Sequence, residues 1–137
     1  MATFILVLWL AFGDIAAVKA EPDLEKRSEA ALANAEHEMD EARKAYNGGD
    51  DQATQSALKE LAESVDVSYD ALEHARTPPR KSKYYKRAEM RVEALIRRLT
   101  GFRDEVSYEI RPQVEDVMKK VSDVHDELIA DIMSKKK

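Results

Sequence analysis

The 137-residue chain contains no cysteine. Disulfide bonds, thiolate zinc sites, iron–sulfur clusters, covalently attached haem and thiol catalysis are therefore excluded. Glycine and proline are scarce, with four residues of each, and aromatic residues make up 7% of the chain. No strand-like alternation of polar and apolar residues is found, whereas residues that favour helices, such as Ala, Glu, Lys and Leu, abound. The composition therefore predicts an all-α fold.

Long apolar runs are also rare, and the single sustained one covers residues 2–18. The run ends at Val18, and Val18 and Ala20 are small residues at the spacing that suits a signal peptidase. We therefore expect residues 1–20 to form a cleaved signal peptide and residues 21–137 to form the mature domain. On this interpretation the protein is periplasmic or secreted, and no membrane span remains after cleavage.

Two features of the apolar run leave other interpretations open. No Lys or Arg precedes the run, and Asp14 interrupts it, so the run is short for a membrane span of about 20 residues. An uncleaved anchor and a start site other than Met1 are the alternatives to a cleaved signal.

Apolar residues recur at alternating steps of three and four along four segments of the expected mature domain. These segments are separated by turn-forming stretches: Asn47–Asp50 with two glycines, Thr77–Pro79 with two prolines, and Ser107–Pro112. Short connections favour antiparallel neighbours, so we predict one antiparallel four-helix bundle built from two helical hairpins. A kinked continuous helix through Ser107–Pro112 is the alternative for the last connection. The apolar seams cover residues 28–46, 58–75, 85–106 and 114–132, and Pro22 is expected to begin the first helix.

Charge is distributed unevenly along the chain. Residues 21–75 carry a net charge of −10, residues 76–103 carry +8 and residues 104–137 carry −3. Cations interleaved with aromatic rings suit an anionic partner, such as a lipid headgroup, a cell-wall polymer or an acidic protein. The alternative is that these cations pair with acidic neighbours across the bundle surface. No nucleic-acid partner is expected, because the chain is acidic overall. The candidate binding residues are Arg80, Lys81, Lys83, Tyr84, Tyr85, Lys86 and Arg87.

The three histidines, His37, His74 and His125, all fall outside the apolar seams and are expected on or near the solvated surface. Asp70 and His74 are one helical turn apart, as a metal-binding pair would be. However, the Glu-x-x-His spacing of di-iron bundles is absent. A haem held between Met39 and His125 is excluded by an axial offset of roughly 12 Å in the predicted bundle. We therefore expect no cofactor and assign no metal ligand.

No motif for catalysis is found. A Gly-rich phosphate loop, a Gly-x-Ser-x-Gly nucleophile elbow and a His-Glu-x-x-His pair are all missing from the sequence. The carboxylates are dispersed along helix faces, so no acid–base pair is singled out. The chain is therefore predicted not to be an enzyme.

Several short segments of the chain resemble known groups of proteins. Residues 42–50, with Tyr46 and Gly49, resemble the helix junction of tetratricopeptide repeats, although no second copy follows at about 34 residues. Tyr46–Asp50, Arg80–Glu89 and Val124–Leu128 resemble segments of an uncharacterised group of small exported bacterial proteins. That second resemblance implies export and a helical fold, and it brings no activity and no site residues.

The sequence as a whole predicts a non-enzymatic helical bundle that acts as a binding module in the cell envelope. Its expected partner is an envelope protein or an anionic surface. A metal-binding bundle that uses histidines and surface carboxylates is one alternative. A structural protein that associates with copies of itself is another, because seams with three–four spacing also suit coiled coils.

Overall fold

The computed structural model describes residues 15–134, and this part of the chain is all-helical, with no strand. The prediction of an all-α fold is confirmed. The helices are α2 (Ile15–Lys19), α3 (Leu24–Asn47), α4 (Asp51–His74), the short 3₁₀ helix η1 (Pro79–Lys81), α5 (Lys83–Glu105) and α6 (Arg111–Met133).

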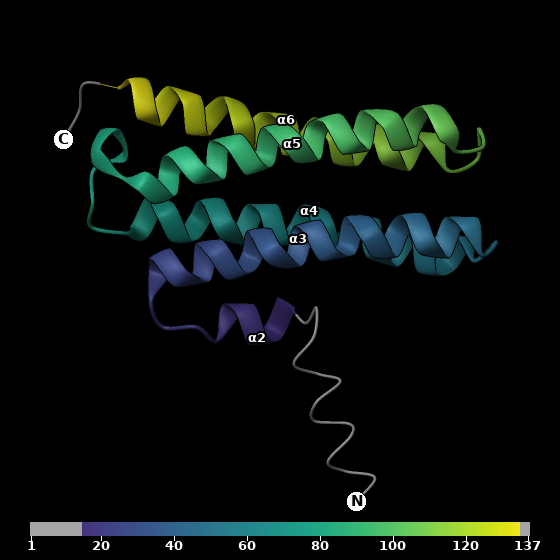
Figure 1. Cartoon of the computed structure of the whole chain (residues 1–137), viewed down its shortest axis with the longest axis horizontal. Helices are drawn as coiled ribbons and strands as arrows, with labels where there is room; N and C mark the ends of the chain where they lie inside the picture. Colours follow the sequence, from purple (N-terminus) through teal and green to yellow (C-terminus); the bar gives the residue numbers. More distant parts are fainter. Residues whose placement is uncertain (1–14, 135–137) are drawn as a thin grey trace, which may run out of the picture.

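The long helices α3 to α6 lie side by side along the long axis of the molecule and form a helical bundle (Figure 1). α3 packs mainly on α4, and α5 packs mainly on α6. The two pairs meet through contacts of α4 with α6 and of α3 with α5. α5 therefore has the acidic helix α3 on one side and α6 on another, and this position decides which of its charges find partners.

Three of the long helices begin at a side chain that caps the free backbone amides of the first turn. Asp23 accepts hydrogen bonds from the backbone amides of residues 25 and 26 at 3.0 and 3.2 Å. Asp50 and Ser82 accept equivalent bonds at the starts of α4 and α5, at 3.0 and 3.2 Å. The expectation that Pro22 begins the first helix is wrong, because Asp23 is extended and serves as the cap, so α3 begins at Leu24.

The connections between the long helices follow from local chemistry. Gly49 has a φ of 77°, in the left-handed region that glycine tolerates, and it reverses the chain between α3 and α4. α4 ends at His74, ahead of the two prolines, and Pro79 opens η1. α5 ends at Glu105, and the next residue, Val106, is extended with a ψ of 158°. The alternative of one kinked helix through residues 107–112 is therefore wrong.

The core is formed by the seams that the periodicity indicated. Its largest fully buried side chains come from all four long helices and from the turn before α6, and they include Leu32, Leu58, Leu95, Phe102 and Leu128. Two serines within the seams are also buried, and the hydroxyl groups of Ser28 and Ser68 satisfy each other across α3 and α4 at 2.8 Å. The spacing of these seams would also suit association between chains, but here the seams are buried against one another within one chain.

Helix α2 is formed by residues near the end of the segment that the sequence assigned to a signal peptide. Val18 is buried, with 8% of its surface exposed, and α2 lies beside α3 (Figure 1). Lys19 Nζ forms an ion pair with Glu63 Oε2 of α4 at 2.7 Å. The rest of the predicted signal, residues 1–14, lies outside the described residues. Within residues 15–134, no helix has the length and apolar character needed to cross a membrane.

We predict that Leu95→Ala lowers the free energy of unfolding by about 2–5 kcal/mol, because Leu95 is fully buried and its truncation leaves a cavity. Met90 lies on the same helix but is 66% exposed, so Met90→Ala should change stability by less than about 0.5 kcal/mol. Urea unfolding followed by circular dichroism measures both. Equal effects of the two substitutions would contradict the burial of Leu95 in the core.

Candidate functional site

The cations that the sequence singled out lie where the chain passes from α4 into α5. This connection, with η1 inside it, lies at the end of the bundle where α6 finishes (Figure 1), and η1 contacts α6. Residues 76–103 contain ten Lys and Arg side chains. The structure divides these ten into two groups of five according to whether a carboxylate lies within ion-pair distance.

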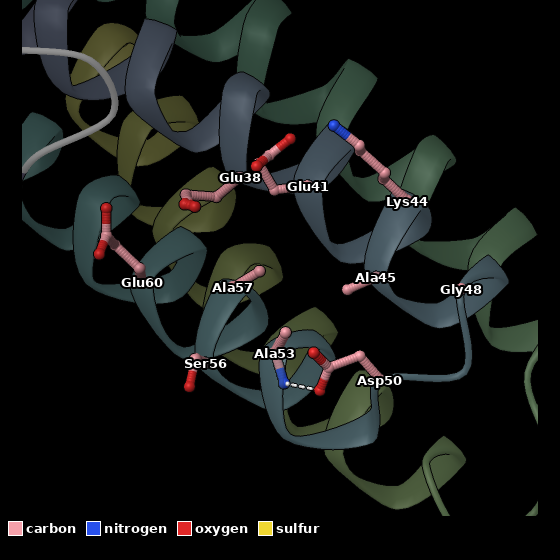
Figure 2. A pocket seen from close by; sticks show the side chains of 10 residues that line it. All are labelled: Glu38, Glu41, Lys44, Ala45, Gly48, Asp50, Ala53, Ser56, Ala57 and Glu60. Atoms are coloured by element: carbon pink, nitrogen blue, oxygen red, sulfur yellow. Dashed lines mark hydrogen bonds between the residues drawn. The ribbon is translucent and has the colours of Figure 1, made fainter. Parts of the chain in front are cut away.

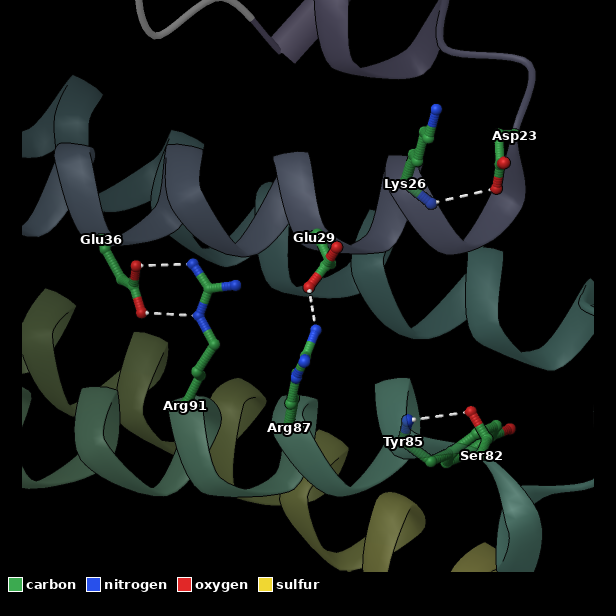
Figure 3. A network of polar contacts seen from close by, with 8 residues as sticks. All are labelled: Asp23, Lys26, Glu29, Glu36, Ser82, Tyr85, Arg87 and Arg91. Carbon is green, nitrogen blue, oxygen red and sulfur yellow. Dashed lines mark hydrogen bonds and ion pairs between the residues drawn. The ribbon is translucent and has the colours of Figure 1, made fainter.

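The second group, from Arg87 onward, is paired with carboxylates. Arg91 makes two hydrogen bonds to Glu36 of α3, with Nη2 to Oε1 at 2.7 Å and Nε to Oε2 at 3.0 Å. Arg87 reaches Glu29, also on α3, at 3.0 Å. Figure 3 shows these two contacts as bridges between α5 and α3. The remaining pairs are Arg98 with Asp40, Arg97 with Glu93 and Arg103 with Asp104.

The first group has no ion-pair partner in the part of the chain that the structure describes. All five side chains are exposed. We call this group the basic link, and it consists of Arg76, Arg80, Lys81, Lys83 and Lys86. The alternative in which these cations pair across the bundle surface therefore holds for Arg87, Arg91 and Arg98, which reach α3. The other two cations of the second group pair within α5, and the basic link is not paired.

The two tyrosines of the predicted binding segment differ in position. Tyr84 is half-buried, and its ring lies 5.3 Å from Lys83 Nζ and 5.8 Å from the guanidinium carbon of Arg87. Tyr85 is only 2% exposed and belongs to the core, so the prediction that it faces a partner is wrong. Its hydroxyl group donates to Asp131 at 3.3 Å. Burial raises the pKa of Tyr85 above its usual value and keeps the hydroxyl protonated.

The histidines are not equivalent. His37 is exposed, and His74 is exposed at the end of α4, where contact with the backbone carbonyl of Asp70 raises the pKa of its ring. His125 is instead half-buried, and its Nε2 lies 2.7 Å from Glu89 Oε2. Glu93 lies one turn further along α5 and completes a group of three metal-ligand side chains. The Glu89–Glu93 spacing was visible in the sequence, but the position of α6 against α5 was not.

A groove of about 590 Å³ runs between α3 and α4, and no pattern in the sequence had indicated it. Figure 2 shows Glu38 directed from α3 toward α4, with Glu60 of α4 nearby. Glu38 is only 8% exposed, and burial, reinforced by the negative charges of Glu60 and Glu41, raises its pKa to about 7. Asn34, one turn before Glu38, donates to Glu60 at 3.1 Å, while its buried carbonyl oxygen has no partner among the described residues.

We predict that Glu38→Gln stabilises the protein at pH 8. A carboxyl group whose pKa is raised in the folded state stabilises the fold below its unfolded value of 4.5, and that contribution is lost as pH rises through about 7. Because one pKa unit corresponds to roughly 1.4 kcal/mol, the expected gain at pH 8 is about 1–3 kcal/mol. Urea unfolding at pH 4 and pH 8 measures it, with the exposed Glu115→Gln as control. An equal gain at both pH values would contradict the assignment.

Comparison of the chain with protein-family models, with curated proteins and with solved structures finds no match. Neither of the two resemblances noted in the sequence is supported by these comparisons.

Proposed function

We propose that this protein is a non-enzymatic binding module of the cell envelope, and that it attaches to an anionic surface through the basic link. The observation that carries the proposal is the division of the ten cations in residues 76–103. Five are held by carboxylates, and five, clustered at one end of the bundle, have none among the described residues.

An approaching anion meets different competitors at the two groups of cations. An ion-paired arginine has to give up its carboxylate before it can bind another anion, whereas the lysines of the basic link have no such competitor. Tyr84 places an amphipathic ring beside these lysines, and such rings are suited to the boundary between an apolar phase and water. Three further lysines follow Ser134 in the sequence, and α6 finishes at the same end of the bundle as the basic link (Figure 1).

We further propose that the working form is exported and consists of α3 to α6 as an antiparallel four-helix bundle. The apolar run of residues 2–18 supports export. The main cluster of core residues draws its side chains from α3, α4, α5, α6 and the turn before α6, and α2 contributes none. Removal of residues 1–20 would therefore leave that cluster intact, at the loss of Val18 and of the Lys19–Glu63 ion pair.

The basic link predicts a charge-dependent attachment. Each Lys near an anionic bilayer contributes about 1 kcal/mol, so reversing the charges of Lys81, Lys83 and Lys86 should weaken binding by at least roughly 100-fold. Co-sedimentation with phosphatidylglycerol–phosphatidylcholine vesicles at low salt measures this. We omit Arg87 from the variant because its ion pair with Glu29 contributes to the bundle.

The matched control reverses three exposed lysines on other helices, Lys44, Lys59 and Lys120, and so changes the net charge by the same amount. The proposal expects this control to bind nearly as well as the unmodified chain. Equal loss of binding in both triple variants would show that net charge, and not the basic link, is responsible. If the unmodified chain binds an acidic envelope protein but not vesicles, the partner is that protein and not an anionic surface.

Export predicts a specific mass. Cleavage after Ala20 yields a chain of residues 21–137, and intact-mass spectrometry of the untagged protein released from its own host measures that chain directly. The mass of the complete chain would contradict cleavage and favour the uncleaved anchor.

A further inference from the structure

We propose that Glu89, Glu93 and His125 form a binding site for a divalent transition-metal ion, with Zn²⁺ as the representative ion. One carboxylate oxygen from each glutamate and one imidazole nitrogen lie within 4.8 Å of one another. Among the residues that the structure describes, no other group of three such side chains meets this distance. The site is separate in residues and chemistry from the basic link.

The ligands come from two packed helices. Glu89 and Glu93 are four residues apart on α5, so their carboxylates lie on one face of that helix. His125 comes from α6, the main packing partner of α5, and its Nε2 already lies 2.7 Å from Glu89 Oε2. The side chains of His125 and Glu89 are only 21% and 20% exposed. The imidazole and the first carboxylate thus lie together before any ion arrives, and an ion that binds Nε2 releases the proton of this hydrogen bond to solvent.

The distances suit a metal ion after small side-chain rotations. Zinc binds imidazole nitrogen and carboxylate oxygen at about 2.0–2.2 Å, so neighbouring ligands of a tetrahedral ion lie roughly 3.3 Å apart. The 4.8 Å limit on the separations in this group exceeds that value by roughly 1.5 Å, which rotation of an exposed glutamate supplies. One imidazole with two carboxylates is a ligand set that suits zinc and similar first-row ions, and three protein ligands leave a position for water.

One cation in the structure competes for the site. Arg97 Nη1 lies 3.2 Å from Glu93 Oε1, and both side chains are largely exposed, at 71% and 49%. Exposed ion pairs of this kind contribute little free energy, so a divalent ion bound by two further ligands should displace the arginine. Because Arg97 competes with the ion, its removal should increase the affinity of the site for the metal.

The test is isothermal titration of the untagged full chain with zinc chloride. We expect one saturable site in the unmodified protein and a rise in melting temperature with zinc concentration. His125→Ala and Glu93→Gln should each weaken binding by at least about tenfold. Arg97→Gln should tighten it. His37→Ala, which removes an exposed histidine on α3, is the matched control and should bind zinc as the unmodified chain does.

Three results would overturn the proposal. They are the absence of saturable binding, zinc affinity that is unchanged in both His125→Ala and Glu93→Gln, and an equal loss of affinity in His37→Ala. Circular dichroism without zinc shows whether each variant is folded. Glu93 is exposed, so Glu93→Gln leaves the fold intact and keeps the test decisive even if His125→Ala perturbs packing between α5 and α6.

Discussion

Burial of four apolar stripes against one another is the interaction on which the rest of this structure depends. A domain of this size without disulfide bonds has to obtain its stability from packing. The stripes supply it because each seam faces its neighbours, so that Leu58, Leu95 and Leu99 are completely excluded from solvent. Once the seams face inward, the charged residues between them are confined to the outer surface and to the boundaries between helices.

Packing also decides the partners of the charges. The acidic helix α3 comes to lie beside α5, and Glu29, Glu36 and Asp40 meet arginines of α5 along that boundary. The match begins at Arg87, because Lys83 and Lys86 at the start of α5 have no carboxylate within ion-pair distance among the described residues. The cations of the basic link are therefore available to an anionic partner. This difference between the two groups of cations depends on how one helix lies beside another.

The boundaries between the helices are not uniformly apolar, because two polar clusters lie in them. Glu38 is held where its charged form is poorly solvated and where Glu60 opposes ionisation, so this part of the α3–α4 boundary is less stable at high pH. His125 and Glu89 instead satisfy each other across α5 and α6. Both clusters need two helices to be brought together, and each consists of residues that look like ordinary surface charges in the sequence.

The sequence by itself determined the helical class, the seams and most helix ends. These features depend on residues near one another along the chain: three–four spacing, the caps Asp50 and Ser82, and Gly49 at its positive φ. Even among these local features, the expectation that Pro22 begins α3 was wrong, because the next residue, Asp23, caps the helix. The sequence placed Tyr85 both in a seam and among the candidate binding residues, and only the tertiary structure decided for the seam. The tertiary structure alone also decided which α5 cations are paired and that His125 meets Glu89. Those outcomes depend on the rotation and register of one helix against another, which are set by the fit of side chains far apart in the sequence.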